Sequence, residues 1–69
     1  MQITAEMSGL VNEIKVKPGD EVAPDDVLVV LESMKMLIEI KSPVKGTVRN
    51  ILCSVEDFVQ EGQVLIELA

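Results

Sequence analysis

The sequence repeats itself at an offset of 37 residues. The aligned positions share glycine, aspartate and branched apolar residues: Gly9 with Gly46, Val11 with Val48, Ile14 with Ile51, Asp20 with Asp57, Val22 with Val59, Val27 with Val64, Leu28 with Leu65 and Leu31 with Leu68. A duplication constrains the architecture strongly, because two copies of one small unit are expected to pack about a quasi-twofold axis. The segment that joins the copies, residues 31–38, is therefore predicted to form an exposed hairpin with Lys35 at or near its tip.

Short apolar runs separated by turn residues predict an all-β fold. No segment shows helical periodicity between capping residues. The predicted strands are 2–5, 10–16, 21–23, 27–31, 37–41, 47–53, 58–59 and 64–68. Eight short strands fit a flattened β-barrel, a barrel-sandwich hybrid of two four-stranded antiparallel sheets, in a single domain that fills residues 1–69.

The inward-facing positions of two equivalent strands slip by one residue. Val11 is followed by Ile14 in the first copy, and Val48 by Ile51 in the second. Strict alternation would place inward residues two positions apart, so a β-bulge is predicted in both copies. The run 27–31 is apolar at every position, which is expected of a central strand that is buried on both faces.

Turn chemistry accounts for the glycines. Lys17-Pro18-Gly19-Asp20 is a strong turn, because proline presets φ and glycine adopts positive φ without strain. We interpret Gly9, Gly19, Gly46 and Gly62 as scaffold positions that are needed for positive φ or for close approach, and assign them no site role.

The composition excludes several classes of function. Twelve acidic and six basic residues give a formal net charge of −6, whereas nucleic acids and anionic membranes are bound by clustered Lys and Arg. Histidine is absent, and there is no metal-binding Cys/His spacing, Gly-rich phosphate loop or nucleophile-elbow serine. Cys53 is the single cysteine and aligns with Val16, which favours a buried apolar role. The chain is therefore predicted to have no catalytic residues and no metal site.

The hydropathy pattern bears on location. The longest apolar run, residues 27–31, is far too short to cross a bilayer, and no basic-then-apolar leader opens the chain. We therefore expect a soluble, cytoplasmic protein with no direct membrane insertion.

Lys35 differs from the other five basic residues by its place between Met34 and Met36, where the two copies meet. In one interpretation both methionines fold back onto the barrel and Lys35 is only a solubilising turn residue. In the other, the methionines are exposed for a partner and the tip presents Lys35 for modification. Near neutral pH only about one lysine in a few thousand is a neutral amine, so acylation needs an activated donor and a modifying enzyme. The symmetric position favours this second interpretation.

Glu32-Ser33-Met34-Lys35-Met36 resembles the attachment motif of biotinyl domains, the family of the biotin carboxyl carrier proteins, with Ser33 where alanine is more common. Further similar segments extend the resemblance over essentially the whole chain: Met7-Ser8-Gly9-Leu10-Val11, Lys17-Pro18-Gly19-Asp20-Glu21-Val22, Ser42-Pro43-Val44-Lys45-Gly46-Thr47-Val48 and Glu61-Gly62-Gln63-Val64-Leu65. Two features depart from the family pattern. Glu6 stands where proline is frequent, and no extra residues follow Gly9, so the protruding loop of some bacterial acetyl-CoA carboxylase carriers is missing.

The resemblance implies a carrier rather than an enzyme. Lys35 would hold biotin through an amide on its Nζ atom, and Met34, Met36 and Glu32 would be recognised by biotin protein ligase or by partner active sites. The implied partners are a biotin carboxylase, which carboxylates the biotin, and a carboxyltransferase or decarboxylase subunit. The chain itself would present the group on a rigid barrel at the end of a flexible tether.

Two alternatives stay open at this point. A lipoyl domain has the same fold, but such domains typically place aspartate before the lysine and alanine after it, so Met34 and Met36 favour biotin over lipoate; some small members accept both groups. The second alternative is an unmodified docking module. The acyl acceptor, the oligomeric state and the extent of the natural polypeptide do not follow from the sequence.

Overall fold

A computed structural model describes all 69 residues, which form eight β-strands and the turns and loops between them. It contains no helix, and so none that could span a membrane. The strands are β1 (Gln2–Thr4), β2 (Gly9–Ile14), β3 (Glu21–Val22), β4 (Val27–Ser33), β5 (Met36–Lys41), β6 (Gly46–Ile51), β7 (Phe58–Val59) and β8 (Val64–Leu68). All eight predicted strands are present, and the bounds of β7 and β8 are as predicted.

The predicted strands 10–16 and 47–53 were too long at their carboxyl ends. Both β2 and β6 end two residues earlier, because the chain then enters a turn that an aspartate closes. The backbone N–H of Lys17 donates to Oδ2 of Asp20 at 3.0 Å, and that of Ser54 donates to Oδ2 of Asp57 at 2.9 Å. The two hydrogen bonds occupy equivalent positions of the repeat, so both copies leave the sheet in the same way.

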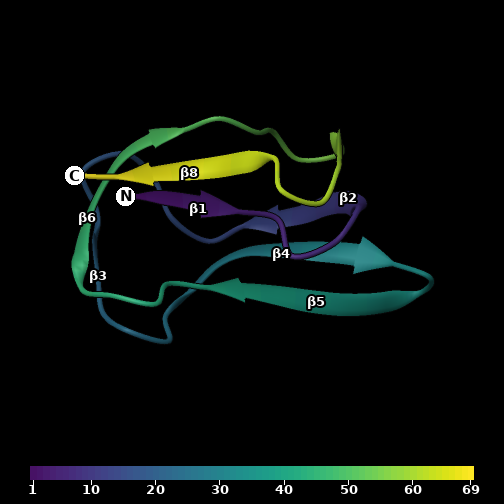
Figure 1. Cartoon of the computed structure of the whole chain (residues 1–69), viewed down its shortest axis with the longest axis horizontal. Helices are drawn as coiled ribbons and strands as arrows, with labels where there is room; N and C mark the ends of the chain where they lie inside the picture. The colour runs from purple at the N-terminus through teal and green to yellow at the C-terminus, as the bar shows by residue number, and fades with distance from the viewer.

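Two four-stranded antiparallel sheets form the two layers of the molecule (Figure 1). Their strand orders are β1-β8-β6-β3 and β5-β4-β2-β7. A shift of 37 residues converts one order into the other, because β2, β3 and β4 correspond to β6, β7 and β8, and β1 corresponds to the second half of β5. The predicted flattened barrel with quasi-twofold symmetry is therefore confirmed.

The predicted bulges lie at equivalent positions. The β2–β4 register shifts between Val11 and Glu13, and the β6–β8 register shifts between Val48 and Asn50. Each extra residue restores Ile14 and Ile51 to the inner side of its sheet, where both pack against the core.

The core fills the space between the sheets with Val, Leu and Ile from both copies. β4 is an inner strand of its sheet, and its residues 28–31 are all buried, as the continuous apolar run predicts. Cys53 is also buried within this cluster, which confirms its apolar role.

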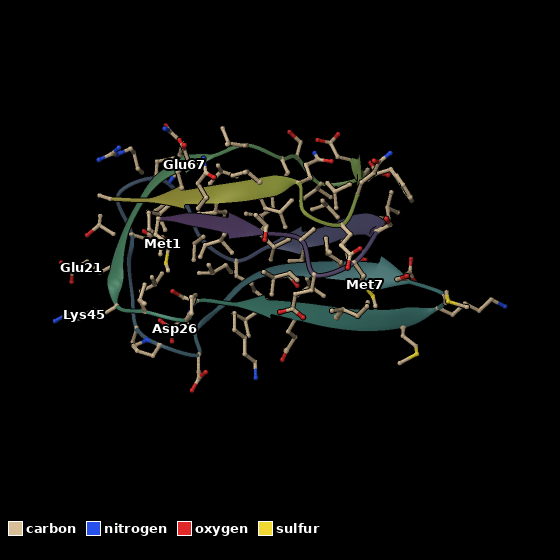
Figure 2. The ribbon with its side chains drawn as sticks, viewed as in Figure 1. Met1, Met7, Glu21, Asp26, Lys45 and Glu67 are labelled. Carbon is tan, nitrogen blue, oxygen red and sulfur yellow. The ribbon has the colours of Figure 1, made fainter.

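The β4–β5 hairpin and the chain termini lie at opposite ends of the molecule (Figure 1). Met1 and Leu68 exchange backbone hydrogen bonds of 2.9 and 2.7 Å, and they occupy the positions that Ile38 and Leu31 occupy in the other sheet. The termini thus take the place of a second hairpin. Lys45 also lies at the terminal end (Figure 2), so it is remote from the β4–β5 hairpin (Figure 1).

The interpretation of the glycines holds at three positions and is wrong at Gly46. Gly19 and Gly62 have φ values of 95° and 87°. A Cβ on Gly9 would lie 2.8 Å from the carbonyl oxygen of Glu32, at the base of the hairpin. Position 46 does not require glycine for either reason. Its φ is not positive, and the atom nearest to an added Cβ is 3.6 Å away.

This difference predicts opposite results for the same substitution at equivalent positions. Gly9→Ala should lower the free energy of unfolding by about 1–3 kcal/mol, because the methyl group must displace the backbone of β4. Gly46→Ala should leave it unchanged or raise it by up to about 1 kcal/mol. Urea denaturation followed by circular dichroism measures both values. Equal effects of the two substitutions would contradict the close approach of β2 to the hairpin.

Candidate functional site

Lys35 lies in the two-residue loop of the β4–β5 hairpin. Ser33 of β4 pairs directly with Met36 of β5, which leaves only Met34 and Lys35 between the strands. Both have positive φ, 52° and 66°, as in a type I′ turn, whose twist matches that of the flanking strands. The predicted hairpin, with Lys35 at its tip, is therefore present in the structure.

This turn is unusual in its residue types. Type I′ turns favour Asn-Gly, and a residue with a Cβ in the left-handed region costs about 1–2 kcal/mol. Met34 and Lys35 adopt that conformation because the pairing of β4 with β5 extends as far as Ser33 and Met36 and leaves no room for a longer loop. The strand pairing on both sides of this two-residue turn restrains its backbone and places Lys35 at the end of the hairpin.

The two methionines do not fold back onto the barrel. Met34 is 92% exposed and Met36 is 66% exposed, so the interpretation of Lys35 as a simple solubilising turn residue loses its structural basis. Side chains at this tip extend away from the body of the molecule (Figure 2). The tip therefore offers apolar surface on both sides of Lys35.

Lys35 has no charged partner. The structure contains one ion pair, between Lys15 and Glu13, so no carboxylate lies within 4 Å of the Lys35 amine. Glu32 is exposed on β4, opposite Leu37 of β5, and makes no side-chain hydrogen bond. The Lys35 amine therefore makes no ion pair within the chain.

No catalytic machinery surrounds the tip. Desolvation by burial, and then the charge of Asp57, raise the pKa of the Cys53 thiol, so this side chain is a poor nucleophile. No cluster of three or more His, Cys, Asp or Glu side chains is arranged to hold a metal ion. The only hollow, of about 250 Å³, lies between β1 and the end of β5 that is remote from the turn, and Lys41 lines it. Neither a metal-ligand cluster nor a hollow thus lies at the tip.

Comparison with known proteins decides the family. The sequence matches the family described as "Biotin-requiring enzyme" over residues 1–68. It is 38% identical to the biotin/lipoyl attachment protein of Bacillus subtilis over 69 residues, which are 100% of this chain and 94% of that protein. The chain belongs to the biotin/lipoyl attachment family. Domains of this family are carriers and are not catalytic themselves.

Biotin/lipoyl relatives of two kinds are similar to the chain. It is 47% identical over 60 residues to the dihydrolipoyllysine-residue acetyltransferase component of the Pseudomonas aeruginosa pyruvate dehydrogenase complex. It is 42% identical over 62 residues to the human mitochondrial propionyl-CoA carboxylase alpha chain. The matches cover 87% and 90% of this chain but only 11% and 8% of those proteins. The family thus includes both carboxylase and acyltransferase relatives.

Solved structures of both kinds also share the fold of this biotin/lipoyl chain. A single-chain, multi-domain long-chain acyl-CoA carboxylase superposes with a TM-score of 0.91 and 27% identity, covering 96% of this chain and 7% of that one. The lipoyl domain of the Azotobacter vinelandii 2-oxoglutarate dehydrogenase complex superposes with a TM-score of 0.78 and 25% identity, covering 97% and 95%. The fold alone therefore does not distinguish biotin from lipoate.

Proposed function

We propose that the chain is a biotin carboxyl carrier and that Lys35 is the residue that holds biotin. The supporting observation is the tip of the β4–β5 hairpin, where a lysine amine without an ion pair stands between two exposed methionines on a two-residue turn. When bound through an amide, biotin supplies a ureido nitrogen that carries a carboxyl group between active sites. Met34 and Met36 favour biotin over lipoate, because lipoyl domains typically have an aspartate before the modified lysine and an alanine after it.

The chain contributes presentation rather than catalysis. The barrel holds the tip at one end of a body that measures 30 × 19 × 18 Å, opposite the chain termini (Figure 1). A long flexible arm on a rigid support raises the local concentration of the attached group at each partner active site. The proposed partners are a biotin protein ligase, a biotin carboxylase and a carboxyltransferase or decarboxylase subunit, all in the cytoplasm.

Parallel modification reactions test the choice of group. The purified chain is incubated with ATP and either biotin plus a biotin protein ligase or lipoate plus a lipoate ligase. We expect the intact mass to increase by one biotinyl group in the first reaction, with the addition mapped to Lys35 by peptide fragmentation, and little or no increase in the second. An increase with lipoate alone would assign the chain to the lipoyl carriers. No increase in either reaction would favour the unmodified docking module.

Carboxyl transfer is tested on the modified chain. With a biotin carboxylase, ATP and labelled bicarbonate, the holo form should acquire acid-labile label, whereas the apo form should not. Failure of the holo form to accept label would contradict the carboxyl carrier function even if biotin were attached at Lys35.

A further inference from the structure

The outer face of the β5-β4-β2-β7 sheet carries a row of exposed apolar side chains directly behind the tip. Leu37 pairs with Glu32, Glu32 pairs with Leu10, and Leu10 pairs with Phe58. Directly opposed residues of neighbouring strands share one face, so these four side chains cross the whole sheet in line. Leu37, Leu10 and Phe58 are 63%, 37% and 67% exposed. We call the line formed by Leu37, Glu32, Leu10 and Phe58 the apolar row, after its three apolar members.

The repeat supplies an internal control for this surface. The Leu10–Phe58 pair corresponds to Thr47–Glu21 in the other sheet, and the two pairs occupy the same place in the topology. The core positions next to them are apolar in both copies, since folding makes the same demand on each. The outer pair is polar in the sheet remote from the tip and apolar in the sheet that carries it. Folding therefore does not explain the apolar pair, and an exposed patch of this kind is typical of a protein-binding surface.

The charges on this face describe the partner. Glu32 lies within the apolar row, and two residues further from the tip Glu39 and Glu13 flank Val30 in the next outward-facing row. Lys15 forms an ion pair with Glu13 at 3.3 Å, but Glu32 and Glu39 have no basic side chain within 4 Å. A complementary surface would combine apolar side chains with Lys or Arg at its edge.

The position of the row selects the kind of partner. An enzyme that acylates Lys35 must bring the amine within about 3–3.5 Å of an activated carbonyl, so its own surface must cover the strands next to the turn. Leu37 and Glu32 are the first outward-facing residues behind that turn. Enzymes that use the modified arm act at its far end, which is farther from the turn than the amine is, so they need to approach these strands less closely. We propose that the apolar row is the docking surface for the enzyme that acylates Lys35, and that this enzyme contacts it with an apolar patch edged by basic residues. The inference rests on the proposed modification of Lys35.

The test transplants the polar pair of the other sheet. The double variant Leu10→Thr/Phe58→Glu reproduces the Thr47–Glu21 pair, which the same fold already accommodates. With a biotin protein ligase, we expect kcat/KM for biotin transfer to fall at least tenfold, through KM, with kcat within about twofold of the unsubstituted chain. The matched control Val55→Glu also replaces an exposed apolar residue by a carboxylate, on the loop before β7, and should stay within twofold.

Two further variants keep the proposal open to contradiction. Leu37 lies on the edge strand β5, so Leu37→Ser should raise KM without lowering the melting temperature. This variant tests the docking surface if the double variant unfolds. Glu32→Gln should raise KM and weaken the dependence of KM on salt. Unchanged KM in folded variants, or a fall in kcat alone, would contradict the docking surface. Biotin transfer to the unsubstituted chain would still support the carrier function in that case. No biotin transfer to the unsubstituted chain would contradict both the docking surface and the carrier function. If the unsubstituted chain formed a dimer and the double variant were a monomer, the apolar row would be assigned to self-association.

Discussion

Lys35→Arg is expected to abolish biotin attachment completely and to leave the stability of the fold unchanged. The guanidinium stays protonated at all relevant pH values and cannot attack a carbonyl, so the positive charge is kept while the nucleophile is lost. Position 35 is exposed, carries no ion pair and has a φ of 66° that arginine adopts as readily as lysine. The free energy of unfolding should change by less than about 0.5 kcal/mol. Intact mass after incubation with ligase, ATP and biotin measures the first effect, and urea denaturation measures the second.

Lys45→Arg is the matched control for this substitution. Lys45 is also exposed but lies at the end of the barrel that carries the termini (Figure 2). The variant should accept one biotin at the same rate as the unsubstituted chain. A biotin adduct on the Lys35→Arg variant would show that another amine is the acceptor. A loss of more than about 1 kcal/mol in that variant would show that the Lys35 side chain contributes to the body of the fold.

The repeat explains why the architecture was predictable from one sequence. Once Gly9 aligned with Gly46 and Val11 with Val48, the two sheets had to be equivalent, and the shared slip to Ile14 and Ile51 predicted a bulge in each. The position of the hairpin followed from the same symmetry, since the hairpin is the segment that joins the first copy to the second. Local turn signals would not have found it, because Met34-Lys35 lacks the Asn or Gly that type I′ turns favour.

Other features could not be predicted because they depend on pairing register or on differences between the copies. Glu56 adopts a φ of 76° at the position equivalent to Gly19, so a glycine in one copy does not imply a glycine in the other. The line from Leu37 to Phe58 requires three separate strand registers, none of which is encoded locally. The sequence therefore predicted Lys35 as the residue to be modified, whereas the row of side chains beside it emerged only from the folded structure.

Val29→Asp is expected to unfold the domain at neutral pH. Val29 is fully buried in β4 and belongs to the core cluster between the sheets. A chain of 69 residues has a free energy of unfolding of roughly 3–10 kcal/mol. The substitution removes about 1.5–3 kcal/mol of apolar burial and adds a buried carboxylate without a partner, which costs several kcal/mol more. The two losses together match or exceed the available stability, so circular dichroism at pH 7 should show no cooperative thermal unfolding transition.

The pH dependence separates the charge from the loss of apolar contacts. Burial raises the pKa of an aspartate in the folded state above its unfolded value of about 3.9, so the folded state binds more protons and the variant loses stability as pH rises. Relative to the unsubstituted chain, the Val29→Asp variant should therefore be least destabilised near pH 4 and most destabilised near pH 7. Val29→Asn has a similar shape without a titrating group, and its destabilisation should be the same at both values. A Val29→Asp variant that melts like the unsubstituted chain at pH 7 would place position 29 outside the core. That result would contradict the inner position of β4, the strand that leads into the hairpin with Lys35 at its tip.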